Sequence, residues 1–339
     1  MPPNIIMLVA DDYPWELFPR AGSQQHALLQ PALARHFVDE GLVLERHYTA
    51  SMCAPSRASL MTGRWPHRAY DYGEAMTYYF GCRGISPGAT TIAEKLKEAD
   101  YRTAFVGKWH LGMTSLNYVP WSRGFDTATG FLLGSVDYES KCSVGQKQTS
   151  QDWAYPDPLG ETGGYCRPSD PSSPLYDWFD TDDLASPYLS PGHAAYNTTY
   201  LTTLHAQRAR RIIAEHGTLA QQQPLFLYLA FAAPHSPIRA TEALIARTEA
   251  LRPSGYFDAC GWFDWGSRGI SSSELDGGGG MAARSRSPMP YLPAPTGTGD
   301  ASLPSPVCNG RTRLVFEAMV LAIDDAVGEV VDELQAQAM

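Results

Sequence analysis

Two uninterrupted apolar runs constrain the fold of this chain more than any other feature. The first, "NIIMLVA", covers residues 4–10, and the second, "LFLYLAFAA", covers residues 225–233. Each run has the length of a strand, is too short to cross a bilayer and lacks the alternation of a half-exposed strand. We therefore expect both to be strands covered on both faces, the first of them central in a mostly parallel sheet, and we expect no transmembrane helix.

Helical patterns alternate with these strands. Residues 90–100 predict a helix with a threonine N-cap, and residues 101–112, "YRTAFVGKWHLG", predict a strand that runs into a loop. The same order recurs when a helical pattern at residues 200–217 precedes the second apolar run, and residues 313–339 predict a long amphipathic helix. This alternation is typical of an α/β fold in which helices flank the sheet.

Two regions lack the pattern. Residues 143–191 are rich in Asp, Pro, Gly, Ser and Tyr, which predicts a long surface excursion. Residues 266–312 include "GGGGMAARSRSPMPYLPAPTGTGDASLPSP", a low-complexity composition that predicts a disordered insertion. We therefore expect one domain, made of residues 1–265 and of the helix at residues 313–339.

Charge and cysteine content restrict the partners of the chain. Asp and Glu outnumber Lys and Arg by 36 to 26, a formal charge of -10, which excludes a general electrostatic attraction for nucleic acid or anionic membranes. An anionic ligand would need a local group of cations. The N-terminal "MPPNIIMLVADD" lacks the features of a secretory signal, whereas six cysteines and a glycosylation sequon at Asn197 indicate an oxidising compartment.

Polar side chains follow three of the predicted strands. They are Asp11 with Asp12, Lys108 with His110, and His235. Functional groups of open α/β sheets gather at the carboxyl ends of strands. Each of these residues taken alone is more often a helix cap, a solvated lysine or a structural histidine, so their joint placement carries the hypothesis of a site.

A cysteine lies in an unusual frame, "CAPSRASLMTGR", at residues 53–64. Its spacing does not suit a zinc site or a redox pair. The frame resembles the signature of the sulfatase family, in which the cysteine is oxidised to formylglycine. The resemblance continues in order through "LVADDYPW", "DYRTAFVGKWHLG", "RGFDTATGFLLGSVDY", "PLFLYLAFAAPHSPI" and "AIDDAVGEVVDEL", and it is strongest to the arylsulfatase B-like members.

The resemblance implies an alkaline-phosphatase-like α/β fold, with a mostly parallel sheet flanked by helices. Residues 1–265 would form the first part of the catalytic domain and residues 313–339 a helix of the same domain. In the family, an Asp-Asn pair and a sulfate-binding lysine follow this helix, so we expect the fold and the metal site to be incomplete at the C-terminal end and the chain to be truncated.

The implied activity is that of a sulfuric ester hydrolase. One hydroxyl of a formylglycine hydrate at Cys53 attacks sulfur and displaces the alcohol, and the other hydroxyl then loses its proton and expels sulfate as the aldehyde re-forms. Asp11, Asp12 and the modified Cys53 would hold calcium, with magnesium as the alternative, because carboxylates are hard oxygen ligands. The metal would polarise the attacking hydroxyl and bind a sulfate oxygen.

The resemblance also assigns roles to the other residues of the site. Arg57 would stabilise the hydrate and the metal site, and Lys108 would bind sulfate as a point charge. His110 would orient the hydrate or act as the base of its collapse. His235 would bind sulfate and protonate the leaving alcohol, and Ser140 matches a sulfate-contacting serine.

Further implications concern maturation and substrate. Cys142 and Cys166 resemble a disulfide pair of the family, and Lys141 stands where the family usually has histidine. The implied partners are a sulfated small molecule or polysaccharide and the formylglycine-generating enzyme, with a lysosomal or extracellular destination through the secretory pathway. Two alternatives remain: a phosphatase, phosphodiesterase or phosphonate hydrolase of the same superfamily, and a non-catalytic protein that retains an anion pocket.

Overall fold

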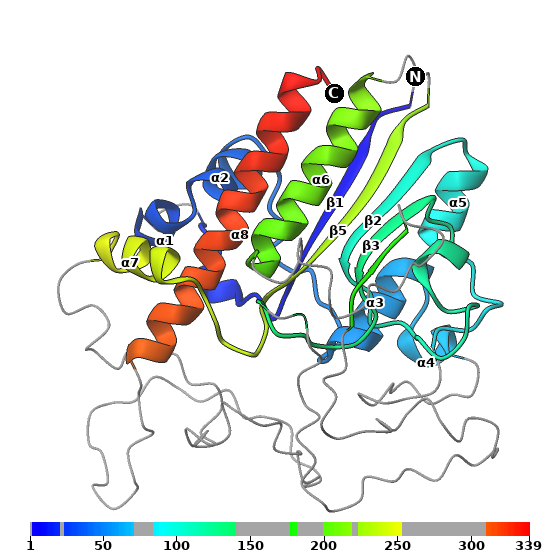
Figure 1. Ribbon diagram of the computed structural model, residues 1–339, viewed down its shortest axis with the longest axis horizontal. Helices are drawn as coiled ribbons and strands as arrows, with labels where there is room; N and C mark the ends of the chain where they lie inside the picture. The colour runs from blue at the N-terminus through cyan, green and yellow to red at the C-terminus, as the bar shows by residue number, and fades with distance from the viewer. Residues whose placement is uncertain are drawn as a thin grey trace, which may run out of the picture.

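The computed structural model describes residues 2–20, 24–70, 84–139, 141, 177–181, 199–218, 223–252 and 310–339. These residues form an α/β structure in which helices cover a twisted sheet (Figure 1). The strands are β1 (Ile5–Asp11), β2 (Arg102–Lys108), β3 (Thr127–Phe131), β4 (Phe179–Asp180) and β5 (Leu225–Pro234). The helices are η1 (Trp15–Leu17), α1 (Gln24–Leu29), α2 (Pro31–Leu33), η2 (Ala34–Asp39), α3 (Cys53–Thr62), α4 (Pro66–Ala69), α5 (Ile92–Glu98), η3 (Pro120–Ser122), α6 (Leu201–Thr218), α7 (Glu242–Ala250) and α8 (Gly310–Ala336).

The sheet runs in the order β1-β5-β2-β3-β4 within the described residues. The first four strands are parallel, and only β4 pairs antiparallel, with β3. Helices α6 and α8 lie side by side over one face of the sheet (Figure 1), where they share a buried core with β5. Helices α3 and α5 pack against the other face in a second, aromatic-rich core. The predicted fold class, a mostly parallel sheet flanked by helices, is confirmed.

Local sequence explains where the helices begin and end. Thr91 caps α5 by accepting the N–H of Glu94 at 3.1 Å, and the Glu94 carboxylate accepts the N–H of Thr91 at 2.7 Å. This reciprocal pair satisfies two amides that the first turn of a helix leaves unpaired. The predicted C-terminal helix is present as α8, which begins at Gly310 rather than at residue 313. None of the helices in the described part of the chain is long and apolar enough to cross a membrane.

The prediction that the first apolar run is a central strand is wrong for the described sheet. There β1 lies at the end of the strand order, and every residue from Ile5 to Ala10 is only half-buried. The second apolar run is an interior strand, β5, which pairs with β1 and β2 and is buried along its whole length, and the middle of the described order is β2. An apolar run indicates that both faces of a strand are covered, but it does not report whether both edges are paired.

The predicted surface excursion at residues 143–191 is wrong for its described part, residues 177–181. Asp177, Trp178 and Phe179 are buried, and β4 extends the sheet. Four residues predicted to have functional or maturation roles lie outside the described residues: Ser140, Cys142, Cys166 and Asn197. The predicted low-complexity insertion lies outside them too, except for its last three residues, which belong to α8.

Candidate functional site

The carboxylate of Asp11 is the centre of the site. It stands at the carboxyl end of β1, is 4% exposed and contacts two cations, Lys108 Nζ through Oδ2 and Arg57 NH2 through Oδ1, the latter at 3.4 Å. Burial raises the pKa of Asp11, but the charges of Lys108 and Arg57 outweigh it and lower the pKa to about 2. Asp11 is therefore ionised at any physiological pH. Its single negative charge faces the two positive charges of Arg57 and Lys108.

The frame around Cys53 builds the first turn of α3. Cys53 is the first residue of this helix, and Pro55 falls in the first turn, where a missing N–H costs nothing. The Ser56 hydroxyl lies 2.9 Å from the carbonyl of Ala50 and 2.8 Å from that of Met52, which fixes the preceding loop. Gly63 ends the helix in the left-handed conformation at a φ of 65°. Most of this frame therefore serves to present Cys53 and Arg57 in the first turns of one helix.

Arg57 contacts the backbone of Lys108, in addition to the contact that both side chains make with Asp11. Arg57 is one helical turn after Cys53, is 3% exposed and donates from NH1 to the backbone carbonyl of Lys108 at 2.7 Å. Lys108 is the last residue of β2 and is fully buried. These contacts bring α3 and the ends of β1 and β2 together.

His110 follows β2 and faces the cysteine. Its Nδ1 lies 3.2 Å from Cys53 Sγ, and the residue is 9% exposed. Burial, followed by the positive charges of Lys108 and Arg57, lowers the pKa of His110 well below its usual value. The imidazole is therefore neutral at physiological pH, and burial and the two cations oppose its protonation.

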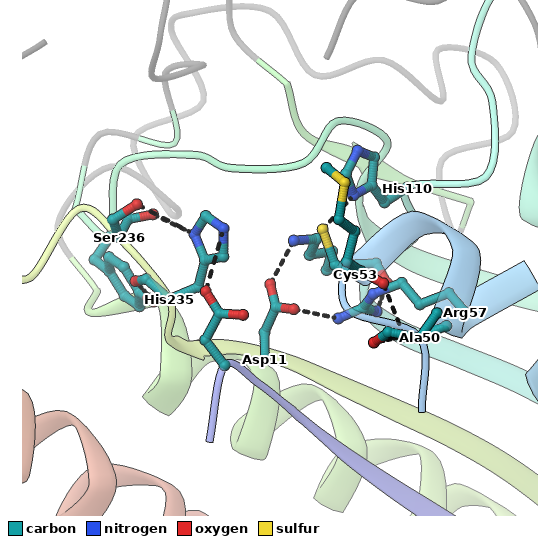
Figure 2. Close-up of polar contacts among 12 residues, drawn as sticks. Asp11, Ala50, Cys53, Arg57, His110, His235 and Ser236 are labelled. Carbon is teal, nitrogen blue, oxygen red and sulfur yellow. Dashed lines mark hydrogen bonds and ion pairs between the residues drawn. The ribbon is translucent and has the colours of Figure 1, made fainter. Parts of the chain in front are cut away.

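His235 lies on the side of Asp11 opposite to Cys53 and His110, as Figure 2 shows. It follows β5, and its Nδ1 lies 2.7 Å from the backbone carbonyl of Ser236, which sets Nδ1 as the protonated nitrogen. Its Nε2 faces Asp12 Oδ2 at 3.7 Å. Asp12 has a φ of 59° and a side chain that is 41% exposed, so its carboxylate reaches solvent, unlike that of the buried Asp11.

Two contacts to the His235 loop were not predicted from the sequence. The Tyr138 hydroxyl donates to the carbonyl of His235 at 2.8 Å, and the Ser135 hydroxyl donates to the carbonyl of Ser236 at 2.7 Å. Ser135 follows a glycine in a loop, where a hydroxyl is usually solvated, and Tyr138 lies in the mostly apolar stretch "GFLLGSVDY" at residues 130–138. The sequence contained no local signal for these contacts, because they join segments about a hundred residues apart.

The donor set agrees with a divalent metal in kind but not in number. Asp11 and Asp12 offer hard carboxylate oxygens, as calcium and magnesium require, yet both oxygens of Asp11 already face cations. Among the described residues, no group of three or more His, Cys, Asp or Glu side chains is arranged to hold a metal. These residues could supply part of a coordination shell, and calcium prefers six to eight oxygens.

Comparisons of the sequence with a family model and with curated proteins both find sulfatases. The family model for sulfatases matches residues 3–339. Arylsulfatase J of Mus musculus is 32% identical over 241 residues, which is 70% of this chain and 33% of that protein. The chain thus spans only a third of this relative. Two solved structures share the fold. Ps i-CgsB with k-i-k-neocarrahexaose has a TM-score of 0.57 and 22% identity over 100% of this chain and 56% of that one. BT4656 with its substrate D-Glucosamine-2-N, 6-O-disulfate has a TM-score of 0.55 and 14% identity over 99% of this chain and 63% of that one.

Proposed function

Because the chain belongs to the sulfatase family, we propose that it carries the catalytic residues of an arylsulfatase-type sulfuric ester hydrolase. The observation that carries this proposal is the contact between Cys53 Sγ and His110 Nδ1 at 3.2 Å, beside two buried cations that share one carboxylate. A neutral base, a modifiable nucleophile position and a local excess of positive charge are what hydrolysis of a sulfate ester requires.

Cys53 provides the position of the nucleophile. Oxidised to formylglycine and hydrated, it would supply two geminal hydroxyls, one of which attacks sulfur. In the structure Cys53 Sγ stands in for such a hydroxyl oxygen, so His110 Nδ1 lies within hydrogen-bonding reach of it. His110 is neutral and would take the proton of a hydroxyl at this position.

Arg57 and Lys108 would stabilise the negative charge of the substrate. Both are buried, and Asp11 offsets only one of their two charges. Lys108 would bind a sulfate oxygen as a compact point charge, and Arg57 would hold the modified Cys53 in place from one turn further along α3. Charges in a site with little water stabilise a sulfuryl group more strongly than they would in solution.

His235 would act on the leaving group. Because Nδ1 is engaged by the Ser236 carbonyl, Nε2 is the ring nitrogen that would face the substrate, with Asp12 Oδ2 at 3.7 Å. From this position His235 would protonate the departing alcohol oxygen. Ser140 would add a contact to sulfate.

A divalent cation, calcium with magnesium as the alternative, completes the proposal. Asp11, Asp12 and the modified Cys53 are the residues that would hold the cation. Further oxygen ligands would be needed to complete its coordination shell. When bound, the cation would supply positive charge that polarises the attacking hydroxyl and a sulfate oxygen.

We propose a sulfated small molecule or polysaccharide as the substrate, since the structural relative BT4656 was solved with a disulfated glucosamine. The formylglycine-generating enzyme would be a partner during maturation. Passage through the secretory pathway to a lysosomal or extracellular site, with glycosylation at Asn197 and a Cys142–Cys166 disulfide, would accompany that maturation.

The proposal is tested with a chromogenic aryl sulfate and the protein expressed together with formylglycine-generating enzyme. We expect sulfate release, a formylglycine mass at the Cys53 peptide and a loss of about 1,000-fold or more in kcat for Cys53→Ala. Ser59→Ala, on the same helix, should retain activity. Faster cleavage of the matching aryl phosphate or phosphonate would favour the phosphatase alternative, and retention of a sulfated ligand without turnover would favour the non-catalytic one.

A further inference from the structure

We propose that Gly134 and Asp177 are positioning residues that hold the His110 imidazole against Cys53, a role that rests on the function proposed above. Neither residue belongs to the site as the sequence predicted it. Both act on the turn after β3, here taken as the last residue of β3 and the bend that follows it, residues 131–134, against which His110 is seated.

The backbone of His110 needs support from outside. Its φ is 56°, in the left-handed region that is strained for a residue other than glycine. Two hydrogen bonds to the turn after β3 hold it there: Trp109 N–H donates to the carbonyl of Phe131 at 3.0 Å, and His110 N–H donates to that of Leu132 at 3.2 Å. The orientation of the imidazole therefore depends on the position of this turn.

Gly134 forms the surface on which the imidazole lies. A Cβ at this position would stand 2.8 Å from His110 Cε1 and 2.9 Å from Nε2, which is closer than real contacts allow. The ring is thus packed directly against the backbone of Gly134 on one side, while Nδ1 contacts Cys53. Any larger residue at position 134 would displace the ring, because the ring is the movable partner of the clash.

Asp177 fixes the turn from behind. Its Oδ1 accepts the N–H of Leu132 at 2.9 Å, and its Oδ2 accepts the N–H of Leu133 at 2.6 Å. Asp177 is 7% exposed, so these two amides have a buried carboxylate as partner rather than water. One carboxylate therefore locks the two residues that precede Gly134, without itself reaching Cys53.

The first test compares Gly134→Ala with Gly88→Ala. A Cβ on Gly88 would meet Ser86 Oγ at 3.5 Å, an ordinary contact, which makes this substitution a matched control. We expect Gly134→Ala to lower kcat about 100-fold with little change in KM, because a displaced catalytic group loses about that much. Gly88→Ala should remain within about twofold of the parent.

A double-mutant cycle with His110→Ala separates positioning from general damage. If Gly134 acts through His110, then His110→Ala and the double variant Gly134→Ala/His110→Ala have the same kcat, and Gly134→Ala lowers Tm less in the His110→Ala background. Additive losses in both kcat and Tm would overturn the role of Gly134. A parent protein that releases no sulfate would refute the proposed function instead, and the Tm cycle would still decide whether the ring rests on Gly134.

Asp177→Ala is compared with Asp324→Ala, because each substitution removes a carboxylate that accepts two backbone N–H groups. Asp324 on α8 accepts the N–H groups of Ala32 and Leu33 at 3.1 and 2.7 Å. Both variants should lower Tm, since each leaves two amides without their acceptor. Only Asp177→Ala should also lower kcat when it is made in the parent protein. Made in the His110→Ala variant, Asp177→Ala should leave kcat unchanged. Equal kcat losses in the two aspartate variants would overturn the role of Asp177.

Discussion

At the carboxyl end of β1 the buried carboxylate of Asp11 faces two cations, whereas beneath the turn after β3 the buried carboxylate of Asp177 faces two backbone amides. The pKa of Asp11 falls to about 2, and that of Asp177 rises to about 6. Burial raises the pKa of both, so the difference comes from the partners: full positive charges outweigh desolvation, and amide dipoles do not.

The difference shows how the two carboxylates serve one site. Asp11 pairs with Arg57 and Lys108 in the protein interior, where two cations would be costly to bury without a carboxylate. Asp177 accepts two backbone N–H groups and so fixes backbone geometry. On the function proposed above, the first would determine where an anion binds, and the second would determine where the base stands.

The largest expected effect is that of Asp11→Asn. The substitution leaves Arg57 and Lys108 buried without their carboxylate, which should lower the free energy of unfolding by ~3–5 kcal/mol and abolish sulfate release. Urea unfolding followed by circular dichroism measures this loss. The double variant Asp11→Asn/Lys108→Met should recover part of it, because one unpaired charge is gone. Parental stability of Asp11→Asn would mean that water reaches the two cations and that the comparison with Asp177 fails.

A smaller effect separates the two carboxylates by pH. The folded pKa of Asp177, about 6, lies above its ordinary value of 3.8, so between these values the folded state binds more protons than the unfolded state. Stability from this group is therefore present at low pH and is lost as pH rises through about 6. Asp11 behaves oppositely: its contribution is present above its ordinary value of 3.8 and is lost only as pH falls toward about 2.

The measurement is urea unfolding at pH 4.5 and pH 7. On going to the lower pH, the parent should gain ~1–3 kcal/mol relative to Asp177→Asn, which cannot titrate. Asp324→Asn offers a second case, because burial also raises the pKa of Asp324 to about 6. Parallel pH profiles for the parent and Asp177→Asn would show that Asp177 is solvated rather than desolvated in the folded state.

Of the two carboxylates, Asp11 could be predicted from the sequence as a site residue and Asp177 could not. Asp11, Lys108, His110 and His235 were predicted as one group because the carboxyl ends of parallel strands meet at one edge of a sheet. That inference needed only local patterns and a general rule of sheet geometry. Cys53 joined the group through the resemblance of its frame to the sulfatase signature.

Long-range packing was beyond such patterns. Asp177 lies in a stretch whose composition indicates a surface loop, yet it contacts Leu132 and Leu133, more than forty residues earlier. Gly134 is one of 30 glycines, and only the approach of His110 distinguishes it from the others. The end position of β1 was missed for the same reason, since strand order depends on which distant segments pair.

The smallest expected effect concerns a carboxylate with a cationic partner at the surface. Asp325 on α8 pairs with Arg247 on α7 through two contacts of 2.7 and 3.0 Å, but the Arg247 side chain is 54% exposed. Asp325→Asn should therefore lower the free energy of unfolding by only ~0–1 kcal/mol, and added salt should remove even this difference. Urea unfolding at low and high sodium chloride measures it, with Glu98→Gln, from the exposed Lys95–Glu98 pair, as the control. If Asp325→Asn were as damaging as Asp11→Asn, burial could not be the reason that Asp11 matters, and the contrast between the partners of the carboxylates would have to be explained by helix packing instead.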